Sequence, residues 1–393
     1  MTTPLHLFLI AGEPSGDRLG ASLMAALKTL RPDIRFSGVG GPLMEAEGLS
    51  SLFPIKDLSV MGLAEVLPRL PKLLRRARET TEAVLSLNPA ALITIDSPDF
   101  CLRVAARVKA ALPALKTIHY VAPTVWAWRP ERAAKMALHI DHVLALFPFE
   151  PPYMEAEGMS CDFVGHPVVA ENAPTASDLA AFRTDLGIAP KGKILLVLPG
   201  SRAGEVARME PVFAEVVRRI VAQHPKTHIV VPASANVAET LAAKVAGWPG
   251  QVTLLDPRGM APDQGEWRKR MAFAAADLAL AASGTVSLEL ASTATPMVIA
   301  YKFNWLTTRI VKKKVKLKTA TLVNILTGTM TVPEFLFEDC TADKITPKVL
   351  EMLDDPDLRL HQSGMSAQAM TLLGKGGEAP GLRAAKSVLR AIP

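Results

Sequence analysis

Short apolar runs alternate with amphipathic segments through the first part of the chain. The apolar runs are LHLFLI (5–10), RFSGVGG (35–41), ALITIDSPD (91–99), KTIHYVAP (116–123), HVLALFP (142–148) and CDFVGHP (161–167). Between the first two, the leucines at positions 19, 23, 27 and 30 follow the spacing of one helix face. Apolar strands separated by helical segments are typical of a parallel sheet covered on both faces. We therefore predict an α/β fold.

The pattern breaks once and then resumes. Proline, alanine and small polar residues interrupt it at residues 165–178. The later apolar runs are KILLVLPGS (193–201), THIVVPAS (227–234), QVTLLD (251–256), LALAAS (278–283) and PMVIAYK (296–302). Because 393 residues exceed what one hydrophobic core usually organises, we expect two domains, 1–170 and 171–374. A final helix at about residues 375–393 can pack back on the first domain.

The composition is that of a globular chain in a reducing compartment. Hydrophobic residues make up 49% and charged residues 21% of the sequence. Three distant cysteines, Cys101, Cys161 and Cys340, form no CxxC pattern, which disfavours disulfides and a zinc site. The N-terminus has no basic segment before its short apolar run, and no 18 consecutive residues are apolar. We expect a protein that is neither exported nor membrane-spanning.

Basic residues gather in two stretches, residues 69–78 and 309–318, within a formal net charge of +6. Either stretch can be a solvated helix face, and anionic lipid and nucleic acid are the alternatives. The first adjoins the apolar segment VMGLAEVLPRLPKLL (60–74), as in interfacial membrane helices. We favour an anionic membrane surface and expect no nucleic-acid partner. The expected contact residues are Met61, Leu67, Leu70, Arg75, Arg76 and Arg78.

A glycine-punctuated turn, AGEPSGDRLG (11–20), follows the first apolar run. Its glycines fit neither GxGxxG nor GxxxxGK[ST], which disfavours a dinucleotide or P-loop triphosphate site. Tight strand-to-helix packing alone would explain the glycines. Glu13, however, stands at the C-terminal end of a strand, where open α/β sheets bind ligands.

A similar turn, LPGSRAGE (198–205), opens the second half. We expect Ser201 to cap the following helix and Arg202 to lie beside the positive helix end. With Gly200, these residues suit a diphosphate, although a capped helix with a surface arginine is the alternative.

A third junction, ALAASGTVSLEL (279–290), places Ser283, Gly284 and Thr285 between a strand and a helix. Backbone N–H groups there can hold phosphate, and Glu289 can accept hydrogen bonds from ribose hydroxyls. A lone exposed helical glutamate is the alternative for Glu289.

The segment IDSPDF (95–100) closes an apolar strand with two aspartates. Asp96 is the candidate general base, and Asp99 is expected to cap the next helix. His119 and His166 are more often packing residues than catalytic groups in such places. The eight histidines form no HExxH motif and no triad with a GxSxG serine, and no metal dependence is predicted.

The ordered strings of this sequence closely resemble the lipid-A-disaccharide synthase family. They are AGEPSGDRLG, GVGGPLMEAEGL, VMGLAEVLPRL, IDSPDF, HYVAPTVWAWRPER, LPGSRAGE, SGTVSLE and LVNILTG. The resemblance runs from residue 5 to about residue 345. It implies a family-19 glycosyltransferase of the GT-B type, with two Rossmann-like domains facing a cleft. The first domain would serve the acceptor and the membrane, and the second would bind the UDP-sugar.

The resemblance assigns roles to four residues. Glu13 matches the glutamate of AGExSGD and Asp96 the proposed base of IDxPDF, so both are expected to be catalytic. Arg202 matches a UDP-contacting arginine, and Asn324 matches the asparagine of PNxxxG in the donor site.

This chain departs from the family pattern near Asn324. Val323 stands where proline is common, and Thr329 and Met330 replace a frequent arginine and glutamate.

The implied reaction is an inverting transfer without a cofactor. UDP-2,3-diacylglucosamine would react with 2,3-diacylglucosamine 1-phosphate to give the β-1,6-linked lipid A disaccharide 1-phosphate and UDP, in the cytoplasm at the inner membrane surface. A UDP-sugar epimerase of the same fold is the enzymatic alternative, and a non-catalytic membrane-binding protein is the alternative of another class. The sequence leaves the oligomeric state open, with a homodimer as one option.

Overall fold

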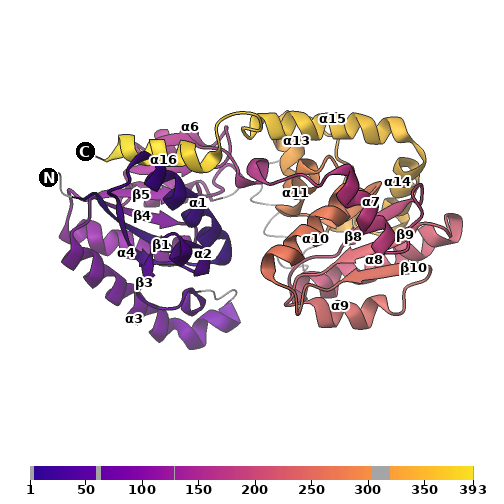
Figure 1. Cartoon of the computed structure of the whole chain (residues 1–393), viewed down its shortest axis with the longest axis horizontal. Helices are drawn as coiled ribbons and strands as arrows, with labels where there is room; N and C mark the ends of the chain where they lie inside the picture. Colours follow the sequence, from indigo (N-terminus) through magenta and orange to yellow (C-terminus); the bar gives the residue numbers. More distant parts are fainter. Residues whose placement is uncertain (1–3, 59–62, 128, 303–318, 393) are drawn as a thin grey trace. The chain divides into compact units, whose positions relative to one another are not determined.

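The computed structural model describes residues 4–58, 63–127, 129–302 and 319–392. The chain forms two compact units (Figure 1). Unit 1 comprises Met1–Ala170 and Leu373–Pro393, and unit 2 comprises Glu171–Leu372.

Unit 1 is built on a seven-stranded parallel sheet of order β3-β2-β1-β4-β5-β6-β7. Its strands are β1 (His6–Ala11), β2 (Arg35–Val39), β3 (Ser50–Ser51), β4 (Ala91–Ile95), β5 (Lys116–Tyr120), β6 (His142–Ala145) and β7 (Ser160–Phe163). The central strands β1 and β4 are almost wholly buried, as their continuous apolar runs predict.

Helices cover this sheet. They are α1 (Pro14–Leu30), α2 (Pro42–Ala46), α3 (Leu63–Leu87), α4 (Pro98–Ala111), α5 (Glu131–Ala137), α6 (Pro151–Glu155) and α16 (Pro380–Ala391), with 3-10 turns η1 (Ile55–Asp57) and η2 (Pro167–Ala170). Phe8, Leu92 and Val104 belong to one buried cluster, in which α4 packs on the sheet. Helix α1 packs against α2 and α16.

Helix α16 brings the C-terminal end of the chain into unit 1 (Figure 1). Its residues Ala384, Ala385 and Val388 are fully buried. Ser387 Oγ lies 2.7 Å from His142 Nε2 and donates to Asp162 Oδ2 at 2.6 Å. The last helix is therefore part of the core of unit 1.

Unit 2 contains a six-stranded parallel sheet of order β10-β9-β8-β11-β12-β13. Its strands are β8 (Ile194–Leu198), β9 (His228–Pro232), β10 (Gln251–Leu255), β11 (Leu278–Ala282), β12 (Met297–Tyr301) and β13 (Glu334–Leu336). Its helices are α7 (Ala176–Asp185), α8 (Ala203–Gln223), α9 (Ala238–Val245), α10 (Pro262–Ala275), α11 (Val286–Ser292), α13 (Leu322–Thr327), α14 (Ala342–Asp354) and α15 (Pro356–Leu372), with the turn η3 (Phe337–Asp339). Val197, Phe213 and Val349 join β8, α8 and α14 in one core.

Each sheet reverses its strand order at one place. In unit 1 the chain builds β1, β2 and β3 outward and then returns to add β4 beside β1. In unit 2 it builds β8, β9 and β10 outward and then adds β11 beside β8. Loops leaving the carboxyl ends of two such neighbouring strands diverge and form the usual ligand crevice of open α/β sheets. The fold therefore marks one candidate site in each unit.

Candidate active site

The switch point of unit 1 brings together the two carboxylates that the sequence analysis selected. Glu13 follows β1 and Asp96 follows β4, and these two strands are paired from Leu7 and Ala91 to Ala11 and Ile95. The two loops touch, because a Cβ atom on Gly12 would lie only 2.4 Å from Ser97 Oγ. Only glycine permits this approach.

Asp96 is held in an unusual backbone conformation. Its φ angle is 52° and that of Ser97 is 43°, both in the left-handed region. Such conformations cost free energy and are frequent at functional sites. The Asp96 amide donates to Tyr120 O at 3.0 Å, and Asp96 Oδ1 accepts from the Ser97 amide at 2.9 Å. The strand-to-helix corner thus fixes a half-buried carboxylate at the sheet edge.

Glu13 occupies the N-cap position of α1 with extended backbone, and its side chain makes no capping hydrogen bond. The side chain is half-buried. Burial raises the pKa of the Cys101 thiol, and the negative charges of Asp96 and Glu13 raise it further.

The aspartate of AGEPSGD, Asp17, has a structural role that the sequence analysis missed. Its carboxylate is buried and accepts hydrogen bonds from three backbone amides: Gly41 at 2.8 Å, Leu43 at 3.1 Å and Met44 at 3.0 Å. It therefore holds the start of α2 against α1. The two acidic residues of this motif therefore differ: Asp17 is structural, whereas Glu13 lies at the candidate site.

Asp99 does not cap α4, so that expectation is wrong. The helix begins at Pro98 with Ser97 at the N-cap position, and Asp99 lies in the first turn. A negative charge there still interacts favourably with the helix dipole.

At the switch point of unit 2, a compact turn follows β8. Gly200 has a φ angle of 124°, and a Cβ atom there would lie 2.6 Å from the Cβ atom of Glu205. Arg202, not Ser201, is at the N-cap position of α8, and the helix has no side-chain cap. The expected Ser201 cap is therefore wrong. Ser201 O instead accepts from Asn236 Nδ2 at 2.9 Å, and its amide donates to Glu205 Oε2 at 3.2 Å.

Glu205 organises this turn and was not identified from the sequence. Its other oxygen accepts from Arg202 Nη1 at 2.9 Å, while the Arg202 side chain remains 60% exposed. Glu205 is the last residue of the LPGSRAGE string, one helical turn after Arg202, and this spacing was the available signal. Arg202 is thus oriented at the helix start with its charge still accessible to a ligand.

The second loop of this switch point holds Ser283, Gly284 and Thr285. They follow β11, which pairs with β8. Thr285 is the N-cap residue of α11 and makes no side-chain cap. A Cβ atom on Gly284 would meet no other atom within 4 Å, so the space beside this residue is open. Glu289, in the first turn, forms an ion pair with Lys269.

Asn324 is 1% exposed and closes a local loop. Its Nδ2 donates to Val332 O at 2.9 Å and to Thr319 Oγ1 at 3.3 Å, and its Oδ1 accepts from the Val332 amide at 2.9 Å. The amide is therefore already engaged within unit 2. A donor-site role for Asn324 stays a prediction.

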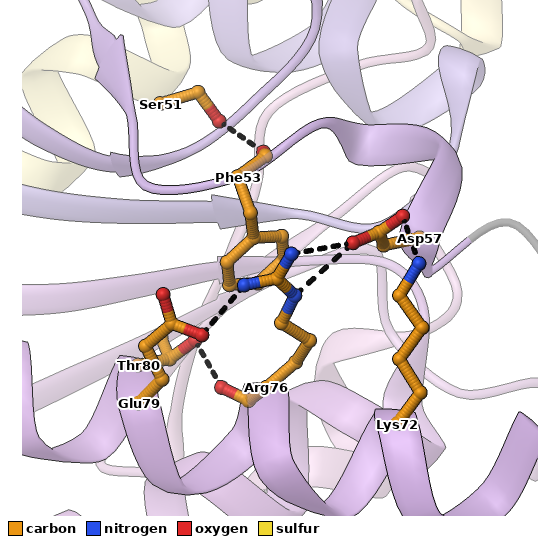
Figure 2. A network of polar contacts seen from close by, with 7 residues as sticks. All are labelled: Ser51, Phe53, Asp57, Lys72, Arg76, Glu79 and Thr80. Carbon is orange, nitrogen blue, oxygen red and sulfur yellow. Dashed lines mark hydrogen bonds and ion pairs between the residues drawn. The ribbon is translucent and has the colours of Figure 1, made fainter.

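Arg76 differs from the other arginines of its basic stretch on α3. Its guanidinium donates twice to Asp57 Oδ2, at 3.1 and 2.8 Å, and once to Glu79 Oε2 at 2.7 Å (Figure 2). It also lies 4.3 Å from the centre of the Phe53 ring. Lys72 Nζ donates to the same Asp57 at 2.6 Å (Figure 2). Arg76 and Lys72 therefore fasten η1 to α3.

The other expected membrane contacts fall into two groups. Leu70, Arg75 and Arg78 are exposed, with Leu70 at 39%. Met61, the side chain of Leu67 and the second basic stretch at 309–318 lie outside the described residues.

Glu150 is a buried carboxyl group that the sequence analysis did not select. It is 2% exposed and accepts from the amides of Leu146 and Phe147, at 3.1 and 3.0 Å, and from Trp126 Nε1 at 3.3 Å. Burial raises its pKa to about 7 against the effect of these donors. Glu150 thereby ties the loop after β5 to the turn after β6.

The two histidines considered from the sequence are packing residues. Burial lowers the pKa of His119 and of His166 to about 4 in each case. His119 Nδ1 lies 2.8 Å from Thr94 Oγ1, and His166 packs against the Phe147 ring. The hydrogen bonds of Asp96 are instead with Tyr120 O and the Ser97 amide.

In the part of the chain that the structure describes, no helix is both long enough and apolar enough to span a bilayer. Nor do the His, Cys, Asp and Glu side chains of that part gather in threes in a way that could hold a metal ion.

Comparison with known proteins identifies relatives along nearly the whole chain. Residues 7–379 match the family described as lipid-A-disaccharide synthetase. A lipid-A-disaccharide synthase of Ruegeria pomeroyi is 57% identical over 99% of this chain and 96% of its own length. The corresponding protein of Rhodospirillum centenum is 48% identical over 99% of this chain and 95% of its own length.

The solved structures agree on the fold. A UDP-GlcNAc 2-epimerase from Neisseria meningitidis bound to UDP-GlcNAc superposes with a TM-score of 0.62 and 11% sequence identity, covering 98% of each chain. At this identity the likeness concerns the fold alone. Together with the two helix-flanked parallel sheets, it confirms the predicted α/β class with two Rossmann-like domains of the GT-B type.

Proposed function

The chain belongs to the lipid-A-disaccharide synthase family, and we propose that it transfers diacylglucosamine from its UDP derivative to 2,3-diacylglucosamine 1-phosphate. The products are the β-1,6-linked disaccharide 1-phosphate and UDP. The observation that carries this proposal is the family match over residues 7–379, with relatives at 57% and 48% identity. Residues 1–170 would serve the acceptor, and residues 171–374 would bind the UDP-sugar.

Asp96 is the proposed general base. Its half-buried carboxylate stands at the switch point of unit 1, held by a left-handed corner and a backbone hydrogen bond to β5. In the proposed step it takes the proton of the acceptor 6-hydroxyl. The hydroxyl oxygen forms a bond to the donor anomeric carbon, and the bond from that carbon to the UDP oxygen breaks on the opposite side, with inversion.

Glu13 is proposed to act beside Asp96. The pairing of β1 with β4 and the contact between Gly12 and Ser97 in the loops that follow them support the placement of both carboxylates in one site. Glu13 would orient the acceptor by accepting a hydrogen bond from a sugar hydroxyl.

The leaving group is proposed to bind at the switch point of unit 2. Gly200, Ser201 and Arg202 would hold the diphosphate from β8, and Ser283, Gly284 and Thr285 would hold it from β11. The exposed guanidinium of Arg202 supports this role, because charge develops on the diphosphate as the anomeric bond breaks. Glu289 would accept hydrogen bonds from the ribose hydroxyls.

Substitution of Asp96 tests the proposed base. Asp96→Asn keeps the side-chain size and an oxygen that can accept from the Ser97 amide, but it removes a proton acceptor of suitable basicity. Turnover is expected to fall by roughly 10²- to 10⁴-fold, with UDP affinity unchanged. The assay measures UDP release from the paired lipid substrates.

Asp99→Asn is the matched control, since Asp99 is exposed in the first turn of α4, three residues away. Its turnover should stay near that of the unmodified enzyme. Near-normal turnover of Asp96→Asn would show that another group is the base. UDP-sugar turnover without an acceptor would instead favour the epimerase reaction.

Membrane attachment through α3 is a separate part of the proposal. Leu70, Arg75 and Arg78 are exposed on this helix and suit an anionic inner-membrane surface. The variant Arg75→Glu/Arg78→Glu should sediment less with phosphatidylglycerol vesicles at low salt than the unmodified chain. Arg31→Glu/Lys226→Glu, two exposed charge reversals on the loops after α1 and α8, is the control because it changes the net charge by the same amount. Equal loss in both variants would point to net charge instead of this helix face.

A further inference from the structure

Lys269 reaches Glu289 from another helix. It lies on α10, and its Nζ is 2.9 Å from Glu289 Oε2 on α11 and 2.8 Å from Glu266 Oε2 on its own helix. The Lys269 and Glu289 side chains are 27% and 33% exposed. This ion pair therefore lies at the border of the solvent, next to the second loop of the unit 2 switch point.

Lys269 stays charged in this position. Burial lowers its pKa, but the carboxylates of Glu289 and Glu266 outweigh burial, so the pKa lies above its ordinary value. The ring of Phe273 is 5.9 Å from Nζ and adds an attraction for the cation. A permanent cation 2.9 Å from Glu289 Oε2 limits the orientations of that carboxylate.

The neighbouring cation, Arg270, is also acted on by the charge of Glu289, which raises its pKa against the larger opposing effect of burial, but its ion pair and hydrogen bond are with other residues. It forms an ion pair with Glu171, and its Nε donates to Asn172 O at 3.0 Å. Among the described residues, Lys269 is thus the cation that forms an ion pair with Glu289.

The backbone spacing of the two helices does not depend on this ion pair. Thr295 Oγ1, just beyond α11, donates to Phe273 O in the last turn of α10 at 2.7 Å, and Phe273 is 1% exposed. Loss of the Lys269 ammonium should therefore change the Glu289 side chain and leave the fold intact.

A carboxylate has about four acceptor sites, so an ammonium on one oxygen leaves capacity for two hydroxyl donors. We propose that Lys269 is a positioning residue, which holds the Glu289 carboxylate toward the vicinal hydroxyls of a bound nucleoside diphosphate. This inference rests on the proposed function, in which Glu289 accepts hydrogen bonds from the ribose hydroxyls.

The test compares the affinities for UDP and 2′,3′-dideoxy-UDP by isothermal titration calorimetry on the full-length protein. The unmodified chain should prefer UDP by about tenfold, the size of one net hydrogen bond to a charged group. In Lys269→Met this preference should fall at least threefold, chiefly through weaker UDP binding. Lys269→Arg keeps the cation and should restore most of the preference.

Glu266→Gln is the matched control, because it removes the other carboxylate partner of Lys269 and leaves the Lys269–Glu289 pair. It should retain the preference for UDP. A preference that is intact in Lys269→Met but lost in Glu289→Gln would overturn the role of Lys269 and leave the ribose role of Glu289 standing. If the unmodified chain binds UDP without discriminating between the two nucleotides, the ribose role itself is wrong.

Discussion

At the residue scale, Asp17 and Glu150 show how buried carboxyl groups shape the loops around the proposed acceptor site. Asp17 caps the start of α2 with three amide hydrogen bonds that cross 24 to 27 positions of sequence. Glu150 joins the loop after β5 to the turn after β6. Glu150 lies where burial opposes its charge and raises its pKa.

The titration of Glu150 predicts a pH dependence of stability. Its pKa is raised from 4.5 to about 7 in the folded protein. The folded state therefore binds this proton more tightly than the unfolded chain, and the resulting stabilisation is complete below pH 4.5 and lost as the pH rises through 7. Relative to Glu150→Gln, which does not titrate, the free energy of unfolding should decrease by about 3 kcal/mol across this interval.

Urea denaturation of both proteins at a series of pH values measures this difference. Glu155→Gln, an exposed glutamate in α6, serves as the control and should follow the unmodified protein at every pH. A difference between the unmodified protein and Glu150→Gln that does not change with pH would show that the Glu150 carboxyl keeps an ordinary pKa.

At the scale of elements, helix α3 both holds the turn η1 through ion pairs and carries an exposed basic face. Arg76 and Lys72 bind Asp57, whose side chain is only 8% exposed (Figure 2). The hydrogen bonds from Lys72 and Arg76, together with the charges of these residues, lower the pKa of Asp57 against the effect of burial. Arg75 and Arg78, one and two positions away, are exposed. The same basic stretch thus serves both the fold and the surface.

Substitutions along α3 should separate these two roles. Arg76→Ala removes three charge-assisted hydrogen bonds and the contact with Phe53, so unfolding should become easier by about 1–2 kcal/mol. Arg78→Ala should leave the midpoint of thermal unfolding unchanged. Equal midpoints for both variants would mean that the network contributes little to holding η1 on α3.

Most strands, and the turns that carry the candidate residues, could be predicted from sequence because their signals are local, whereas the strand order that makes these turns neighbours could not. The apolar runs at 5–10 and 91–95 coincide with β1 and β4, and the turns that follow them carry Glu13 and Asp96. The same holds for β8 and its glycine turn at Gly200. The signals for these elements are continuous apolar runs and glycines at strand ends, and they lie within each element or a few residues from it.

The remaining contacts could not be predicted for two reasons. Some join residues that are distant in sequence, and others depend on which of several nearby residues takes a helix-capping position. Arg76 is fixed by Asp57, 19 positions away, and Glu289 by Lys269, 20 positions away on another helix. Ser201 was expected to cap α8, but the helix begins one residue later, and Glu205 binds the Ser201 amide instead. Several residues compete for each helix start, and only the folded geometry decides among them.

At the scale of the whole molecule, unit 1 is completed by the end of the chain. Arg383 Nη2 donates to Phe163 O at 2.6 Å, and Arg390 forms an ion pair with Asp162 at 2.8 Å. Residues more than 200 positions apart therefore share one core and one network. Unit 2 lies between them in sequence and has its own sheet and core.

Disruption of α16 should therefore affect the units unequally. Val388 is fully buried, and Val388→Asp would place an unpaired charge in the core of unit 1, at a cost of several kcal/mol. We expect unit 1 to become sensitive to limited proteolysis and glycosyl transfer to be lost, while UDP still binds to unit 2.

Leu360→Asp, at a position of α15 that is 72% exposed, is the control and should leave both units resistant. Peptide mapping of the proteolysis products, with calorimetry of UDP binding, distinguishes the outcomes. If Val388→Asp made both units equally sensitive and abolished UDP binding, unit 2 would depend on unit 1 for its stability, contrary to the separate cores of the two sheets.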